Sequence, residues 1–296
     1  WLGQGWTDCP LAKEDLITVR HQLTMTTGLD DGVADPYCTA DTCLICVADA
    51  STRWAYHNAP YTLLDKVIEA ATAKTMNGFV AAALRAKTGI VGAFLKSGYN
   101  NVFYSTPRAM ARFGLLMVNR GVWGSDTILR DTSFFRQMIT SSQESNKSYG
   151  YLWWLNGKSS YMVPQSQVVI PGMMCPPAPA DMVAAMGKNG QFINVVPSLD
   201  LVVVRMGDAP ENTMVPFLLN NGIWERLMPV IKDGTSAHRP IQAGEVHRAY
   251  REGGNEVFDL QGRRVRLGLR SAPVERLLVT RDSRSRVRVV LDYHHE

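Results

Sequence analysis

The sequence contains no apolar run long enough to cross a lipid bilayer. Its densest apolar segments cover only residues 79–84, 115–118 and 201–204, whereas a spanning helix needs about 20 residues. Charged residues make up 20% and apolar residues 46%, a balance that excludes disordered and coiled-coil proteins. The 296 residues, at about 150 per domain, predict one large domain or a medium domain with an appendage.

Lysine is absent from the last fifth of the chain. Residues 238–296 contain 12 Arg, no Lys and 8 acidic residues, whereas residues 1–237 contain 19 basic and 19 acidic residues. The shift predicts a boundary, with a main domain over 1–236 and a small β module over 237–296. Because acids are interspersed and no aromatic pattern accompanies the arginines, the composition favours a salt-bridged surface over nucleic-acid binding.

Cysteine is scarce, and its placement leaves two interpretations open. The five residues are Cys9, Cys38, Cys43, Cys46 and Cys175. Cys43 and Cys46 have the spacing of half a zinc site, but no second pair or nearby His follows. A disulfide between Cys38 and Cys43 needs only these two residues and is favoured over a metal site. Such a bond indicates an oxidising compartment, the periplasm or the outside of the cell.

Local patterns predict helices in the first half of the chain and strands later. Helices are expected over 15–28, with Thr18 as N-cap and Gly28 as C-terminal stop, after Pro60, over 79–87 and from Pro107 to a stop at Gly121. The runs QFINVVP and LVVVRMG predict an antiparallel hairpin, and a helix is expected over 213–231. Three short β-rich runs follow in the tail. This order predicts an α+β architecture.

Four segments then occur in a fixed order: ITVRHQLTMTTGL (17–29), WAYHNAPYTLL (54–64), YSTPRAMARFGLLMVNRG (104–121) and MGKNGQFINVVPSLDLVVVRMG (186–207). Together they resemble the serine hydrolases of the β-lactamase-related family, which includes class C β-lactamases, DD-peptidases, esterases and 6-aminohexanoate-dimer hydrolase. The resemblance extends over about residues 1–232. It implies a β-lactamase/transpeptidase-like fold, an antiparallel sheet flanked by helices, with no metal or organic cofactor.

The family is characterised by a Ser-x-x-Lys nucleophile motif, a Tyr-x-Asn motif and a Lys-Thr-Gly or His-x-Gly motif. Tyr56, His57 and Asn58 match the second motif residue by residue. A phenol beside a lysine ammonium can relay a proton to and from a serine hydroxyl, so the resemblance implies acid/base catalysis by Tyr56. Asn58 would bind substrate or the lysine, and His57 is expected to be structural. The alternative for Tyr56 is a buried aromatic residue.

The third motif departs from the lactamase pattern. The run GKNGQ resembles the Gly-x-x-Gly-Gln version of the 6-aminohexanoate-dimer hydrolase branch. Ala185 and Met186 precede it where Lys-Thr or His-Thr would be, so the lysine that would recognise a β-lactam carboxylate is missing from this motif. The Lys188 amide is expected to be one of two oxyanion-hole donors, and glycines let substrate approach the backbone. The alternative is an exposed strand start. The residues assigned to substrate binding are Gly187, Asn189, Gly190, Gln191, Trp153 and Trp154, the two tryptophans also being compatible with core packing.

The first motif is absent, because no Ser in this sequence has a Lys three residues later. The chain also starts at Trp1 without Met or a signal segment, and we expect the nucleophile in a missing N-terminal part. The resemblance thus implies a secreted or periplasmic serine hydrolase acting by acyl transfer on a small-molecule or peptide ester or amide, inactive as this fragment. The alternative is a non-catalytic ligand- or peptidoglycan-binding module. The tail segment VFDLQGRRV resembles secretion-sorting modules of Bacteroidetes proteins. The alternative is that it belongs to an ordinary accessory β module.

Overall fold

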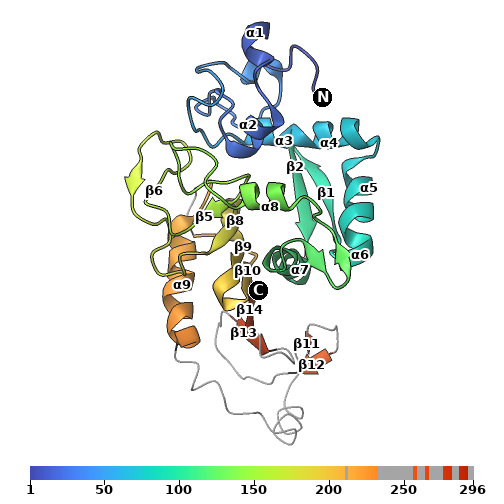
Figure 1. The fold of residues 1–296 in the computed structure, drawn as a ribbon, viewed down its shortest axis with the longest axis vertical. Helices are drawn as coiled ribbons and strands as arrows, with labels where there is room; N and C mark the ends of the chain where they lie inside the picture. The colour runs from blue at the N-terminus through green and yellow to red at the C-terminus, as the bar shows by residue number, and fades with distance from the viewer. Residues whose placement is uncertain (211–212, 233–255, 259–263, 267–275, 282–286, 293–296) are drawn as a thin grey trace, which may run out of the picture.

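The computed structural model describes residues 1–210 and 213–232, and further along the backbone of four strands. At its centre is a six-stranded sheet with the order β13-β14-β10-β9-β8-β5. These strands are β5 (Trp154–Leu155), β8 (Val183–Gly187), β9 (Gln191–Val196), β10 (Leu201–Arg205), β13 (Arg276–Arg281) and β14 (Val287–Asp292). β8, β9 and β10 pair antiparallel, and helices flank the sheet (Figure 1). The predicted α+β class is therefore confirmed.

The hairpin of β9 and β10 follows directly from its sequence. All five residues of β10 are buried, which suits a β-branched run covered on both faces. The strands join through a short 3-10 turn, Pro197–Leu199, and Asp200 adopts a left-handed φ of 50°. The predicted hairpin is present. β8, by contrast, was not predicted, because its two alanines carry little strand preference.

Two long helices cover opposite faces of this sheet, α7 (Pro107–Val118) and α9 (Phe217–Lys232) (Figure 1). Val202 and Val204 face the core under α7, whereas Leu201 and Val203 face the core that contains Trp224 of α9. Gly114 permits the close approach of α7, since a Cβ there would lie 2.3 Å from a Val202 methyl carbon. The central strands are therefore apolar on both faces.

Hydroxyl caps start the helices at the predicted places. Thr18 caps α2 (Val19–Thr24) in a capping box with His21, and the Thr106 side chain accepts a hydrogen bond from the Ala109 amide at the start of α7. The expected extent of the first helix, 15–28, is wrong at both ends. The helix ends at Thr24, and Met25 takes the left-handed conformation that Gly28 was expected to supply.

The remaining elements surround this centre. The two strands β1 and β2 form a separate hairpin beside α5. The helix expected over 79–87 spans α5, a π-helical turn (Ala81–Arg85) and α6, and it ends at Gly89 as expected. The other helices and short strands are α1 (Leu11–Glu14), α3 (Asn58–Thr62), α4 (Leu64–Thr72), α5 (Met76–Val80), α6 (Ala86–Thr88), α8 (Thr132–Met138), β1 (Gly92–Ser97), β2 (Asn100–Ser105), β3 (Val122–Trp123), β4 (Asp126–Thr127), β6 (Ser160–Tyr161) and β7 (Ile170–Pro171).

The tail contributes strands in two places. β11 (Glu256–Phe258) and β12 (Arg264–Arg266) pair with each other, whereas β13 and β14 join the central sheet, β14 pairing in parallel with β10. A boundary at residue 236 and a sorting role for the tail stay predictions, and much of 237–296 lies outside the described residues. Among the helices of the described ranges, none has the length and apolarity of a membrane span.

Candidate active site

Tyr56 lies in an aromatic wall on the α9 side of the sheet. Its ring stacks on Trp154 at 5.8 Å, and Tyr149 and Trp54 pack against both. Tyr56 is 9% exposed. Burial raises the pKa of the Tyr56 phenol, and the neighbouring phenols of Tyr61 and Tyr37 raise this pKa further. The phenol is therefore protonated at neutral pH in this chain.

The other residues of this motif are buried as well. Asn58 begins α3, and its Nδ2 donates a hydrogen bond to the Tyr61 hydroxyl at 3.1 Å. The Asn58 Oδ1 has no hydrogen-bond partner, so an acceptor remains open beside the phenols. His57 is 1% exposed, and neither ring nitrogen has a partner. Burial lowers the pKa of His57 to about 4, which keeps the imidazole neutral.

A disulfide-bonded loop crosses this motif and carries Tyr37. The carbonyl of Pro36 accepts a hydrogen bond from the Ala59 amide at 3.0 Å, which places the loop against the start of α3. The structure contains the expected disulfide between Cys38 and Cys43 and a second one that was not predicted, between Cys9 and Cys46. The disulfides engage both cysteines of the Cys-x-x-Cys pair, which removes the zinc alternative.

The GKNGQ segment forms the hairpin turn between β8 and β9. Gly187 pairs with Gln191 across the turn, and Asn189 has a left-handed φ of 60°. The Lys188 Nζ lies 5.6 Å from the centroid of the Tyr37 ring, a cation–π contact. Tyr37 thus links two motifs that are separated by about 130 residues in the sequence. The structure places Lys188 beside the loop that covers Tyr56 and Asn58.

The predicted substrate-binding residues divide between this place and others. The Gln191 side chain exchanges two hydrogen bonds with the backbone of Gly207, at 2.7 and 3.1 Å, so its amide braces the hairpin. Trp154 packs on Tyr56, but Trp153 stacks on Phe113 of α7 on the other face of the sheet. Consecutive residues of a strand point to opposite faces. The structure therefore separates the two tryptophans.

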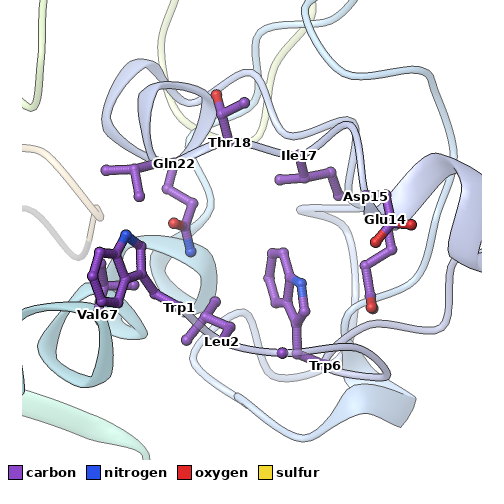
Figure 2. Close-up of a pocket in the computed structure, with 11 residues that line it drawn as sticks. Trp1, Leu2, Trp6, Glu14, Asp15, Ile17, Thr18, Gln22 and Val67 are labelled. Atoms are coloured by element: carbon purple, nitrogen blue, oxygen red, sulfur yellow. The ribbon is translucent and has the colours of Figure 1, made fainter. Parts of the chain in front are cut away.

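Two hollows lie on the part of the chain that the structure describes. Figure 2 shows one of about 230 Å³, in which the Gln22 side chain points between Trp1 and Trp6. The Gln22 Nε2 donates a hydrogen bond to the carbonyl of Pro60, two residues after Asn58, at 2.9 Å. A second hollow, of about 450 Å³, lies over the disulfide loop. Its lining residues are Asp30, Val33, Ala34, Asp35, Cys38, Thr42, Cys43, Ile45 and Tyr99.

Sequence reasoning missed several residues of this region. The phenols of Tyr37 and Tyr61 raise the pKa of Tyr56, and Arg205 donates hydrogen bonds to the GKNGQ turn. Tyr61 could have been found, since it follows Asn58 by three residues on one helix face. Within the described ranges no group of His, Cys, Asp and Glu residues is arranged to hold a metal ion.

Comparison with protein families identifies one match. The family model described as Beta-lactamase matches residues 10–216, which is more than two thirds of the chain. Among curated proteins, none matches this sequence.

Two of the solved structures that match this chain are bacterial proteins. One is described as "putative beta-lactamase from Bacteroides dorei DSM 17855", with 15% identity, a TM-score of 0.49, and coverage of 70% of this chain and 71% of the other. Another is described as "putative 6-aminohexanoate-dimer hydrolase from Bacillus anthracis", with 15% identity and a TM-score of 0.48. The match to it covers 72% of this chain and 62% of the Bacillus chain.

Proposed function

Because this chain belongs to the beta-lactamase family, we propose that it is part of a serine hydrolase that cleaves an ester or amide by acyl transfer. The nucleophilic serine of the Ser-x-x-Lys motif is then supplied from outside residues 1–296, since no serine here has the required lysine. The observation that carries the proposal is the Lys188 contact with Tyr37, beside the Tyr56 and Asn58 pair.

In this proposal Tyr56 relays the proton between the nucleophile and the leaving group. Its phenol holds its proton in the chain as described, because burial and two neighbouring phenols raise its pKa. A lysine ammonium brought beside the phenol would favour the phenolate and lower this pKa. Tyr56 then accepts the serine proton during acylation and returns a proton to the departing group.

Asn58 supplies the polar contact that holds this arrangement. Its Nδ2 is engaged by Tyr61, but its Oδ1 is a buried acceptor without a partner. Leaving such an acceptor unpaired costs about 1–3 kcal/mol, so a donor from the nucleophile lysine or from a substrate amide would be bound favourably. We expect Asn58→Ala to raise KM as well as lower kcat.

The GKNGQ turn supplies the second wall. The backbone amide of Lys188 is the proposed donor to the oxyanion of the tetrahedral intermediate. Asn189 and the two glycines of the turn would contact the substrate, and Trp154 would back the cleft behind Tyr56. The substrate class is a small ester or amide, with lactams less favoured because Ala185 and Met186 precede Gly187 where the Lys-Thr of the lactamase motif would be.

The two disulfides support an exported protein. Structural disulfides persist in oxidising compartments and are rare in the cytosol, so we place the protein in the periplasm or outside the cell. The arginine-rich tail would engage secretion machinery if it is a sorting module.

Active-site labelling tests the proposal. We expect a fluorophosphonate probe to label one serine in the longer protein that includes the upstream sequence, and none in residues 1–296. The longer protein should hydrolyse p-nitrophenyl esters, whereas residues 1–296 should not exceed background. If the upstream sequence lacks a Ser-x-x-Lys pair and the longer protein binds ligand without turnover, the chain is instead a binding module of the same fold.

A further inference from the structure

A single guanidinium group lies under the GKNGQ turn. Arg205, the last residue of β10, is 3% exposed. Its Nη1 donates to the carbonyls of Asn189 at 3.2 Å, Gly190 at 2.9 Å and Gly207 at 3.0 Å. Its Nη2 donates to the carbonyl of Asp208. Four backbone carbonyls from two segments therefore converge on one side chain.

The turn is shaped to accept this group. Asn189 and Gly190 both have left-handed backbone conformations, with φ of 60° and 77°. A Cβ at Gly190 would lie 2.4 Å from the Arg205 Nη1 and 2.8 Å from a Leu219 methyl carbon. Glycine is therefore required at position 190 both for the conformation and for the space that the guanidinium occupies.

The hydrogen bonds also fix the direction of the turn's amide groups. The peptide bonds of the described residues are trans, so each N–H points opposite to the carbonyl of the residue before it. With the carbonyls of Asn189 and Gly190 directed at Arg205, the amides of Gly190 and Gln191 point away from it. The turn is thus held with its carbonyls inward.

We propose that Arg205 is a positioning residue of the candidate active site: its guanidinium holds the Gly187–Gln191 turn so that the backbone of Lys188 stays where the oxyanion forms. The inference rests on the proposed function, in which the Lys188 amide is an oxyanion donor. Arg205 itself touches no substrate. Its effect is on the geometry of the donor, and displacement of a catalytic group by about 1 Å is enough to lower a rate by about 100-fold.

The test compares Arg205→Met with Arg205→Lys and with a matched control, Arg112→Met, in the longer protein that includes the upstream serine. Arg112 donates from Nη1 to one loop carbonyl, that of Gly89, at 3.0 Å, away from the turn. We expect Arg205→Met to speed hydrogen exchange of amides 187–191 at least about 10-fold and to lower kcat about 10- to 100-fold, with KM changed less than about 3-fold. Arg205→Lys, which keeps the charge but has fewer donors, should fold and fall between.

The outcomes separate this inference from the proposed function. Unchanged exchange in the turn, or faster exchange with an unchanged kcat, would overturn the positioning role while leaving the hydrolase intact. An equal loss of kcat in Arg112→Met would show that the effect is general loss of packing and would also overturn it. If the unmodified longer protein has no hydrolase activity, the proposed function fails, and the exchange measurement alone decides whether Arg205 orders the turn.

Discussion

The two faces of the central sheet differ in chemistry. The face under α7 is packed with aliphatic residues such as Leu115, Val195 and Val204. The opposite face is aromatic and methionine-rich, with Trp54, Tyr56 and other large rings in contact. The unpartnered buried polar atoms also divide unevenly. Those of the described residues include atoms of Trp54, His57, Asn58, Asn194, Asn220 and Trp224, which lie in the Tyr56 region, on α9 or on the strand face between them.

This difference separates packing from function. A buried polar atom without a partner costs free energy, and the α7 face avoids that cost with apolar side chains. The Tyr56 face keeps such unpartnered atoms, as expected of a surface that binds a substrate or another segment of the protein. The predictions below either remove this asymmetry or measure it.

The largest expected effect is on catalysis by Tyr56. In the longer protein, Tyr56→Phe should lower kcat by about 10² to 10⁴, because general acid/base groups contribute about that much, while the ring still packs on Trp154. The matched control is Tyr149→Phe, which removes the hydroxyl of another buried ring in the same cluster, 6.3 Å from Tyr56. Steady-state kinetics on the best ester substrate decides: near wild-type kcat in Tyr56→Phe would return Tyr56 to a packing role.

The tryptophan pair tests the division between the two faces directly. Trp153→Phe and Trp154→Phe remove equal volumes from opposite faces, and both side chains are at least 95% buried. We expect each to lower the free energy of unfolding by about 1–3 kcal/mol. Only Trp154→Phe should also lower kcat, since Trp154 supports Tyr56. Urea denaturation and kinetics together check this, and an equal loss of kcat in Trp153→Phe would contradict the division of the faces.

The sequence predicted those parts of the fold that depend on local patterns. Thr18 was identified as a cap and Pro107 as the start of a helix, and the β9–β10 hairpin was identified from its β-branched runs. Gly28 was wrongly taken as a helix stop. Its actual role is steric, since a Cβ there would lie 2.3 Å from the Ala48 carbonyl oxygen. That close approach of two distant segments leaves no local signal.

The residues of the candidate site were predictable only where a local sequence motif marks them. Tyr56, Asn58 and Lys188 came from a motif resemblance, and their catalytic roles stay predictions. Arg205 could not be found, because in LVVVRMG it resembles the exposed end of a strand. The second disulfide was missed for a similar reason, since Cys9 and Cys46 are 37 residues apart. Long-range pairing is set by tertiary structure.

Disulfide removal should show which crosslink supports the Tyr56 face. By the chain-entropy relation, the bond between Cys9 and Cys46 is worth about 4 kcal/mol and the short Cys38–Cys43 bond about 2 kcal/mol. We expect the double serine variant at Cys9 and Cys46 to lower the free energy of unfolding more than that at Cys38 and Cys43. Only the second should also weaken substrate binding, because Cys38 directly follows Tyr37 in the chain and its bond fixes the backbone beside that ring. An equal loss of stability in both variants would contradict the loop-length argument.

The last prediction concerns the pH dependence contributed by His57. Burial lowers the pKa of this histidine from 6.5 to about 4, Asp31 and Asp30 opposing that shift and Arg53 adding to it. Below pH 6.5 the His57 imidazole of the unfolded chain therefore binds a proton, whereas that of the folded chain stays neutral down to about pH 4. The stability that comes from the neutral imidazole is complete above pH 6.5 and is lost as the pH falls toward 4, a change of about 2–3 kcal/mol between pH 7 and pH 4.5.

Urea denaturation at these two pH values should show a smaller drop for His57→Gln than for the wild type. His21→Gln is the control, because both nitrogens of His21 have partners, the Thr18 amide and the Ser51 hydroxyl, and it should keep most of the wild-type drop. If His57→Gln retains the full pH dependence, His57 is protonated in the folded chain, and the Tyr56 face contains a charge that its burial was expected to exclude.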